Sequence, residues 1–452
     1  MPTILREDTL TFTYKQKKAE NSYVEMTPFS VYDEEQYIKT AMLPQEALAQ
    51  YIKAQHRLDP IFDNDHGKEY SYAREIIFPK SRKGSNKGFA NRAGDKLDEI
   101  LQVSKVKLKT DIQFADVCAA PGAWSLYLLQ YYGSARGVGM SMPILGTKVE
   151  DTWYPQLRQN PRFKATFGVT ETGDVYDFRN IAELAKVCSQ SWGEPTTVVA
   201  PPPEKPLEAK PEILPSGLLD LVTCDGGFQI AKSPTGQHCE QLQEIITQRL
   251  LLSEFLVALQ LLKENGTFVC KMYDCICPFN VQLIFLMSQM FEETVFVKPE
   301  HSRVVNAEKY VVFKSFQPQS SIIEKIKQIH AEWKADTCYY QIIEESEELK
   351  QFCVFVNRVN ETLVKRCTDA LNVVIDKTEE LVRQKANPVI KQTDPSAPQT
   401  NQKSDEKEWN DIFKKDEPRD YYRDQRPYYN RRDNNYRRDD RREYNDRNQY
   451  YK

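Results

Sequence analysis

FADVCAAPGAWS (114–125) is the segment that decides the fold expected for this chain. An apolar run carrying Asp116 leads into a turn at Pro121–Gly122, and the helical pattern WSLYLLQYY (124–132) follows. A strand that turns on glycine into a helix is typical of α/β folds, whose ligands bind at the carboxyl ends of the strands. Glycine at 122 would let a ligand approach the backbone closely. No GxGxxG pattern accompanies the turn, so a dinucleotide is not the first ligand indicated.

Short apolar runs alternate with amphipathic stretches over residues 112–316. The expected strands are 112–119, 135–142, 218–225, 267–273, 293–299 and 309–316, with a strand or loop at 165–177. The expected helices are 92–103, 124–132, 278–291 and a long one over 239–265 that Gly266 stops. This alternation predicts an α/β, Rossmann-like fold with a mostly parallel central sheet and helices on both faces. Continuously apolar strands agree, because parallel strands are buried on both faces.

The flanks of this region differ from it in composition. Residues 1–75 have weak periodicity and are expected to wrap or extend the main domain, which is placed at 76–318. The proline-rich stretch 194–217 is expected to form an inserted surface loop or lid, because proline blocks helices and removes a donor. Residues 319–392 predict a pair of helices, for which packing against the sheet is favoured over a binding role. Residues 393–452 are too polar to fold and predict a disordered tail.

The overall composition excludes few classes of protein. A formal charge of −4 does not mark a nucleic-acid binder, so any such surface must be local. The ten cysteines lack zinc-ribbon spacing, and neither Cys275–Cys277 nor His238–Cys239 is favoured as a metal site. No signal peptide is expected, because MPTILREDTLTF is acidic and lacks an apolar region, and no membrane span is expected. The free thiols suit a reducing compartment, nucleus or cytoplasm.

Four charged residues stand in separate segments: Lys96 in NRAGDKLDEI, Asp225 in DLVTCDGG, Lys271 in GTFVCKMYD and Glu308 in SRVVNAEKYVV. With DVCAAPGAWS, these segments resemble in order, over about residues 78–316, the motifs of the FtsJ-like ribose 2′-O-methyltransferases. Ala123 and Trp124 depart mildly from the family's usual Gly and Phe. The last segments look most like the mRNA cap-1 ribose methyltransferases of eukaryotes and viruses. The residues that carry this likeness are Lys298, Pro299, Ser302, Arg303, Asn306, Glu308 and Tyr310.

The resemblance implies methyl transfer from S-adenosylmethionine to the ribose 2′-hydroxyl of the first transcribed nucleotide of capped RNA, giving S-adenosylhomocysteine. Lys271 would touch the hydroxyl, with its pKa lowered by burial or by the like charge of Lys96. Asp225 would lie near the methyl group, and Glu308 would hydrogen-bond the lysines. The residues implied for the cofactor are Asp116, Ala120, Pro121, Gly122, Trp124, Asp174 and Asp225. No metal is implied.

RNA contacts are expected from the basic loop before Lys96 and from the last motif: Lys80, Arg82, Lys83, Lys87, Arg92, Ser302 and Arg303. A solvated charge run remains the alternative for the loop. The Arg- and Tyr-rich tail suits weak RNA binding or self-association, with a passive tail as the alternative. A ribosomal or transfer RNA methyltransferase and a non-catalytic RNA-binding subunit both stay open. Capped mRNA and other capping or transcription proteins are the expected partners, and a viral origin would place the protein in a virion or viral factory.

Overall fold

The computed structural model describes residues 9–15, 18–79, 92–144, 146–192, 217–228, 230 and 232–386. The tail and nearly all of the proline-rich insertion therefore lie outside the described residues. So do Lys80, Arg82, Lys83 and Lys87 of the basic loop.

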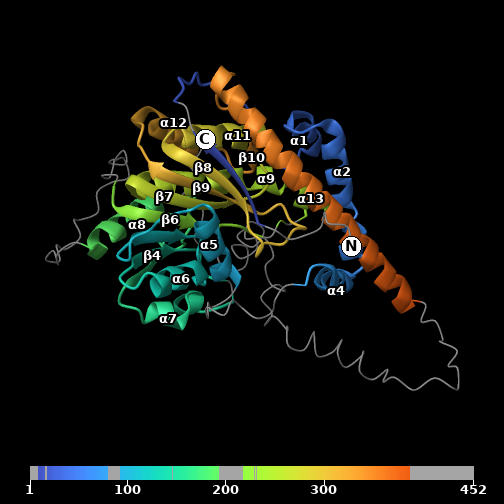
Figure 1. Ribbon diagram of the computed structural model, residues 1–452, viewed down its shortest axis with the longest axis horizontal. Helices are drawn as coiled ribbons and strands as arrows, with labels where there is room; N and C mark the ends of the chain where they lie inside the picture. Colours follow the sequence, from blue (N-terminus) through green and yellow to red (C-terminus); the bar gives the residue numbers. More distant parts are fainter. Residues whose placement is uncertain are drawn as a thin grey trace, which may run out of the picture.

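An eight-stranded sheet forms the centre of the molecule (Figure 1). Its strands, in spatial order, are β1 (Leu10–Lys15), β8 (Phe291–Lys298), β9 (Lys309–Phe316), β7 (Leu262–Met272), β6 (Leu219–Cys224), β3 (Gln113–Val117), β4 (Arg136–Met140) and β5 (Phe163–Thr166). The strands from β5 to β7 run parallel, whereas β9 is antiparallel to β7 and β8, and β1 is antiparallel to β8. The predicted mostly parallel α/β sheet is confirmed.

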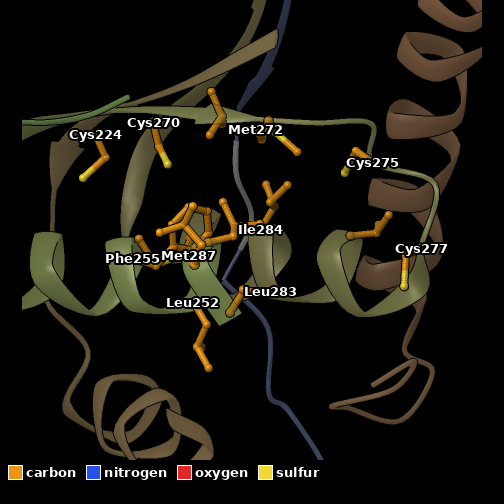
Figure 2. Close-up of a cluster of buried hydrophobic side chains, with 14 of the residues drawn as sticks. Cys224, Leu252, Phe255, Cys270, Met272, Cys275, Cys277, Leu283, Ile284 and Met287 are labelled. Carbon is orange, nitrogen blue, oxygen red and sulfur yellow. The ribbon is translucent and has the colours of Figure 1, made fainter. Parts of the chain in front are cut away.

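Helices cover both faces of this sheet. The helices α5 (Arg92–Val103), α6 (Ala123–Tyr131) and α7 (Pro155–Arg158) share one hydrophobic core with side chains of β3, β6, β7 and β9. The helices α8 (Phe178–Trp192), α10 (Gln248–Leu261), α11 (Pro278–Ser288) and α12 (Ser320–Ala331) pack on the opposite face. Figure 2 shows the second core, where Phe255 of α10 and Ile284 and Met287 of α11 lie near Cys224 and Cys270 on the strands. Those two thiols are buried core groups.

The prediction of a single helix over residues 239–265 is wrong. The chain instead forms η3 (Glu240–Leu242), α9 (Gln243–Ile246) and α10, and the residues from Leu262 onward already belong to β7. The backbone becomes extended at Leu262, which pairs with Leu219 at the start of β6. Helical periodicity did not reveal this change, because Leu261 and Leu262 are both buried and the apolar pattern continues across the end of the helix.

The weak periodicity of the N-terminal region concealed four helices: α1 (Glu34–Thr40), α2 (Gln45–His56), α3 (Asp59–Asp63) and α4 (Gly67–Ile77). A short strand, β2 (Phe29–Ser30), pairs with β10 (Thr337–Cys338). The predicted pair of C-terminal helices is present as α12 and the 40-residue α13 (Glu347–Ala386). Helix α13 packs mainly on α2 and α4, and also on α11, so its main partner is the N-terminal region rather than the sheet (Figure 1). No helix within the described ranges is long and apolar enough to cross a membrane.

Candidate active site

Asp116 at the end of β3 holds the following turn in place through hydrogen bonds to neighbouring elements. This carboxyl is buried, with Oδ2 accepting from Ser125 Oγ at 2.6 Å and Oδ1 accepting from Thr223 Oγ1 at 2.8 Å. Burial raises the pKa of Asp116 to about 7, although both hydrogen bonds oppose this. Asp116 therefore ties β3 to β6 and to the start of α6, and it would act on a ligand through the turn rather than by contact.

Gly122 is required by the backbone and by packing. Its φ of 101° is in the left-handed region, and a Cβ there would lie 2.2 Å from Leu157 Cδ1 on α7. The close contact is thus made by protein, not by the ligand that the sequence suggested. Trp124 differs from its expected role in the same way: it is 3% exposed and its Nε1 donates to Ala93 O at 2.7 Å. Its ring packs on Tyr310, so it belongs to the wall behind the site rather than to a cofactor surface.

The carboxyl edge of β3, β4 and β5 offers both acidic and apolar groups. Gly173 packs against the end of β4, because a Cβ there would meet Ser141 O at 1.9 Å, and this contact places Asp174 at the edge. Burial raises the pKa of Cys118 at the end of β3, and the charges of Glu254 and Asp174 add to this effect. Two apolar side chains are unusually open there, Met142 at 41% and Val169 at 59%. Acidic and apolar groups side by side suit a ligand with a cationic centre and a flat apolar part.

The four separate motifs of the sequence meet around one hydroxyl group. Tyr310 Oη accepts from Lys96 Nζ at 2.9 Å and lies 3.2 Å from both Asp225 Oδ1 and Glu308 Oε1. Lys96 Nζ is also 3.2 Å from Glu308 Oε1. Lys271 Nζ donates to Asp225 O at 2.8 Å and forms an ion pair with Asp225 Oδ1 at 3.3 Å. The structure therefore brings together all four residues predicted as catalytic, which we call the tetrad (Lys96, Asp225, Lys271 and Glu308).

The pKa of Lys271 is shifted in the opposite direction to the one expected from the sequence. Burial alone would lower the pKa of its ammonium, but the charge of Asp225 outweighs burial, with further contributions from Tyr273, Glu308 and Glu254. The pKa is consequently raised above the ordinary lysine value. The expectation of a lowered pKa is wrong for the protein alone, and Lys271 is an ammonium at neutral pH.

A loop between β8 and β9 carries Glu308, and two charged residues hold this loop. Lys298 Nζ is buried inside it and donates to Glu308 O at 2.6 Å, Asn306 O at 2.9 Å and Asn306 Oδ1 at 2.8 Å. Glu99 of α5 accepts from the backbone of Glu300 at 2.6 Å and from His301 Nδ1 at 2.6 Å. These bonds fix the loop to the helix that carries Lys96.

A family model for FtsJ-like methyltransferases matches residues 89–316, half of the chain and all of the tetrad. The chain belongs to the FtsJ-like methyltransferase family.

Several relatives of this FtsJ-like protein carry names that state an activity. A Trypanosoma brucei brucei protein named cap-specific mRNA (nucleoside-2′-O-)-methyltransferase 1 is 32% identical over 56% of this chain and 62% of its own length. Its Trypanosoma cruzi namesake is 29% identical over 69% of this chain and 81% of its own length. A Caenorhabditis briggsae protein whose name adds "inactive" is 31% identical over 47% of this chain and 22% of its own length. The matched part thus spans less than two thirds of the first relative, and identity alone does not separate active from inactive relatives.

The predicted RNA contacts of this FtsJ-like chain are only partly described. Ser302 is 4% exposed and accepts from Lys298 Nζ at 3.3 Å, so it supports the loop instead of facing RNA. Arg303 is partly exposed, with Nη2 at 3.9 Å from Glu75 Oε1. Arg92 begins α5, and its side chain is outside the described residues.

Sequence reasoning missed the site roles of Tyr310 and Lys298. Both were quoted as parts of a motif, but neither was assigned a role in the site. One signal was available for Tyr310, which follows Glu308 by two residues in a strand pattern, so the two side chains are expected on one face. In the sheet Tyr310 is also the direct partner of Lys271 across β7 and β9.

The described residues contain one group of side chains close enough to share a metal ion, Asp59, His238 and Glu240. His238 Nε2 lies 3.0 Å from Asp63 Oδ1, and Lys232 Nζ pairs with the same carboxylate at 2.6 Å. This group is explained as a surface network of ion pairs, and no metal site is inferred from it.

Proposed function

We propose that this protein is an S-adenosylmethionine-dependent mRNA cap (nucleoside-2′-O-)-methyltransferase that acts on the first transcribed nucleotide of capped RNA. The observation that carries the proposal is the convergence of the tetrad: Lys96, Asp225 and Glu308 contact the Tyr310 hydroxyl, and Lys271 pairs with Asp225. The names of the two trypanosome relatives support the choice of capped RNA. Because a relative named inactive matches about equally well, the case for activity depends on the tetrad.

The cofactor fits the chemistry of the edge described above. When bound, S-adenosylmethionine supplies an electrophilic methyl group on a cationic sulfonium and leaves as S-adenosylhomocysteine. Asp174 and Asp225 would attract the cationic part, and the open side chains of Met142 and Val169 would cover the purine. Ala120 and Pro121 are half-buried in the turn that Asp116 supports, so this turn is partly open to a ligand.

The tetrad residues orient the nucleophile and stabilise its charge. A ribose hydroxyl is a weak nucleophile, and negative charge develops on its oxygen as it attacks. Lys271 is an ammonium held by Asp225, so it donates a hydrogen bond to that oxygen and stabilises the developing charge. It can accept the hydroxyl proton only as it gives up one of its own. Lys96, held by Glu308 and Tyr310, supplies a second cation beside it. Holding reactants in place contributes about 7–11 kcal/mol in well-ordered sites.

The test compares two lysine variants for transfer of label from S-adenosylmethionine to a short capped RNA. We expect Lys271→Ala to lose at least about 100-fold in kcat, the lower range for a positioned acid–base group. Affinity for RNA should stay nearly unchanged. Lys314→Ala is the matched control, because Lys314 lies on β9 but bonds Ser104 O and Glu293 away from the tetrad. Full transfer by Lys271→Ala, or equal loss in both variants, would overturn the proposal.

A further inference from the structure

Helix α10 carries a single carboxylate in an apolar run, Glu254 in LLLSEFLVALQL. It is 1% exposed and contacts the turn that follows Asp225. Its Oε1 accepts from Gly226 N at 3.0 Å, and its Oε2 accepts from Cys270 Sγ at 3.3 Å. Within the described part of the chain, no cation forms a direct ion pair with it. Burying a carboxylate without a paired cation costs folding free energy, so such a residue is a candidate for a functional role.

A small cavity lies beside Glu254 and Lys271. Both residues line it, together with Tyr273, Asn280, Gly226 and Thr247. The space open to the centre of a water molecule is about 10 Å³, roughly the minimum that holds one water. Asn280 Oδ1 is buried there, and no donor among the described residues reaches it. The lining offers a water a carboxylate, an ammonium and an amide oxygen, which are the kinds of polar partner that a buried water needs.

We propose that a water in this cavity joins Lys271 to Glu254, and that Glu254 receives the proton that methyl transfer releases. The proposal rests on the proposed function and names the route by which its proton leaves. The ribose oxygen forms a bond to the methyl carbon, and the electron pair of the broken carbon–sulfur bond stays on sulfur. The hydroxyl proton moves to Lys271 Nζ while Nζ passes one of its own protons through the water to Glu254. The protonated Glu254 then loses this proton to solvent, so Lys271 ends the cycle as the ammonium with which it began.

The electrostatic surroundings suit this role. Burial raises the pKa of Glu254 to about 7, opposed by the Cys270 hydrogen bond and by the charge of Lys271. A proton acceptor works best with a pKa near the operating pH. The titratable groups that face Glu254 from β3, β6, β7 and the segments after them are Cys118, Cys224, Asp225, Cys270, Lys271 and Tyr273. Burial raises the pKa of the three thiols and of Tyr273, so these stay neutral near pH 7.

The kinetic test is Glu254→Gln, which keeps an oxygen for Gly226 N but cannot take a proton. We expect kcat to fall roughly 100-fold, with KM for RNA and for S-adenosylmethionine unchanged. The wild-type kcat should rise with pH through about 7, and this limb should be missing in the variant. Glu244→Gln is the control, because Glu244 is equally buried with a pKa also raised to about 7 but does not line the cavity. Unchanged kcat and pH profile in Glu254→Gln would overturn the proposal.

A second measurement uses the protein without cofactor or RNA. The infrared carbonyl band of the protonated Glu254 should titrate near pH 7, and it is identified by its loss in Glu254→Gln. Lys271→Ala should raise the midpoint, because the neighbouring cation that favours the carboxylate is removed. The difference spectrum between Lys271→Ala and wild type gives this result even if Glu254→Gln does not fold. An unmoved midpoint would show that the cavity does not couple the two groups.

Failure of the two proposals can be told apart. If the wild type methylates no RNA, the proposed function fails, whereas the infrared titration still tests the link between Lys271 and Glu254. If the wild type is active and Glu254→Gln matches it, only the proton route fails.

Discussion

The hydroxyl of Tyr310 contacts three members of the tetrad. Tyr310→Phe removes that hydroxyl while the ring keeps its packing on Trp124. Hydrogen bonds to charged groups are worth about 1.5–3 kcal/mol, so we expect kcat to fall about 10- to 100-fold. Steady-state kinetics on capped RNA would measure the loss, and the melting temperature would show that folding is intact. A kcat equal to the wild type would mean that Tyr310 does not position the lysine and carboxylates.

The pH dependence of stability should report on Glu308. Burial would raise its pKa, but Lys96, Lys271 and Lys298 outweigh burial and lower the pKa to about 2. A carboxyl whose pKa is depressed by folding stabilises the protein above its unfolded pKa, and this contribution fades as pH falls toward the folded value. Glu308→Gln should therefore unfold more easily than wild type at pH 7, with the difference in unfolding free energy shrinking between about pH 4.5 and 2. A pH-independent difference would contradict this charge assignment.

For individual residues, the sequence predicted which four side chains form the tetrad, but it did not predict the direction of the Lys271 pKa shift. Lys96, Asp225, Lys271 and Glu308 each stood in a recognisable motif, and all four converge in the structure. The sign of the Lys271 pKa shift could not be predicted, because it depends on the distance from Nζ to Asp225. A clue to Glu254 was present, since a lone carboxylate in an apolar helix is unusual, but its neighbours come from three other segments.

Among the structural elements, the turn between β3 and α6 depends on a glycine at positive φ. Gly122→Ala would place a side chain at positive φ and 2.2 Å from Leu157 Cδ1. Strained residues of this kind cost of order 1–3 kcal/mol, and the contact with Leu157 adds to this. We expect a lower unfolding free energy and weaker binding of S-adenosylmethionine, measured by denaturant unfolding and calorimetry. Gly133→Ala is the control, because nothing lies within 4 Å of a Cβ there. Equal stability of the two variants would contradict the packing role of Gly122.

Elements with strong patterns were predicted closely, and weakly patterned ones were not. The expected helix 92–103 matches α5, and the strand, turn and helix of 112–132 match β3 and α6. Helices α1 to α4 were missed, because α1 and α3 have only 7 and 5 residues and because several buried groups of these helices are polar or aromatic, such as Glu69, Tyr37 and Tyr51. The break before α10 is set by tertiary contacts: the buried Glu244 of α9 accepts from Ile276 N and Cys277 N.

In the whole molecule, helix α13 joins the N-terminal region to the sheet domain. Phe352 is fully buried between Tyr14 of β1 and Phe285 of α11, whereas Arg57, directly after α2, pairs with Asp376 and Glu379 at the surface. Phe352→Ala should cost about 3–5 kcal/mol, and Arg57→Ala no more than about 1 kcal/mol, because surface ion pairs contribute little. Denaturant unfolding of both variants would test this. A larger loss in Arg57→Ala would mean that ion pairs, rather than the apolar contact, attach α13.

The position of the transferred methyl group tests the proposed function most directly. Label from S-adenosylmethionine would be followed on three short RNAs: one with an N7-methylated cap, one with an unmethylated cap and one without a cap. Nuclease digestion would then locate the label within each RNA. We predict label on the first ribose of capped RNA and none on uncapped RNA. Equal labelling of uncapped RNA would assign the protein to another class of RNA methyltransferase, and no label on any RNA would contradict the enzymatic role itself.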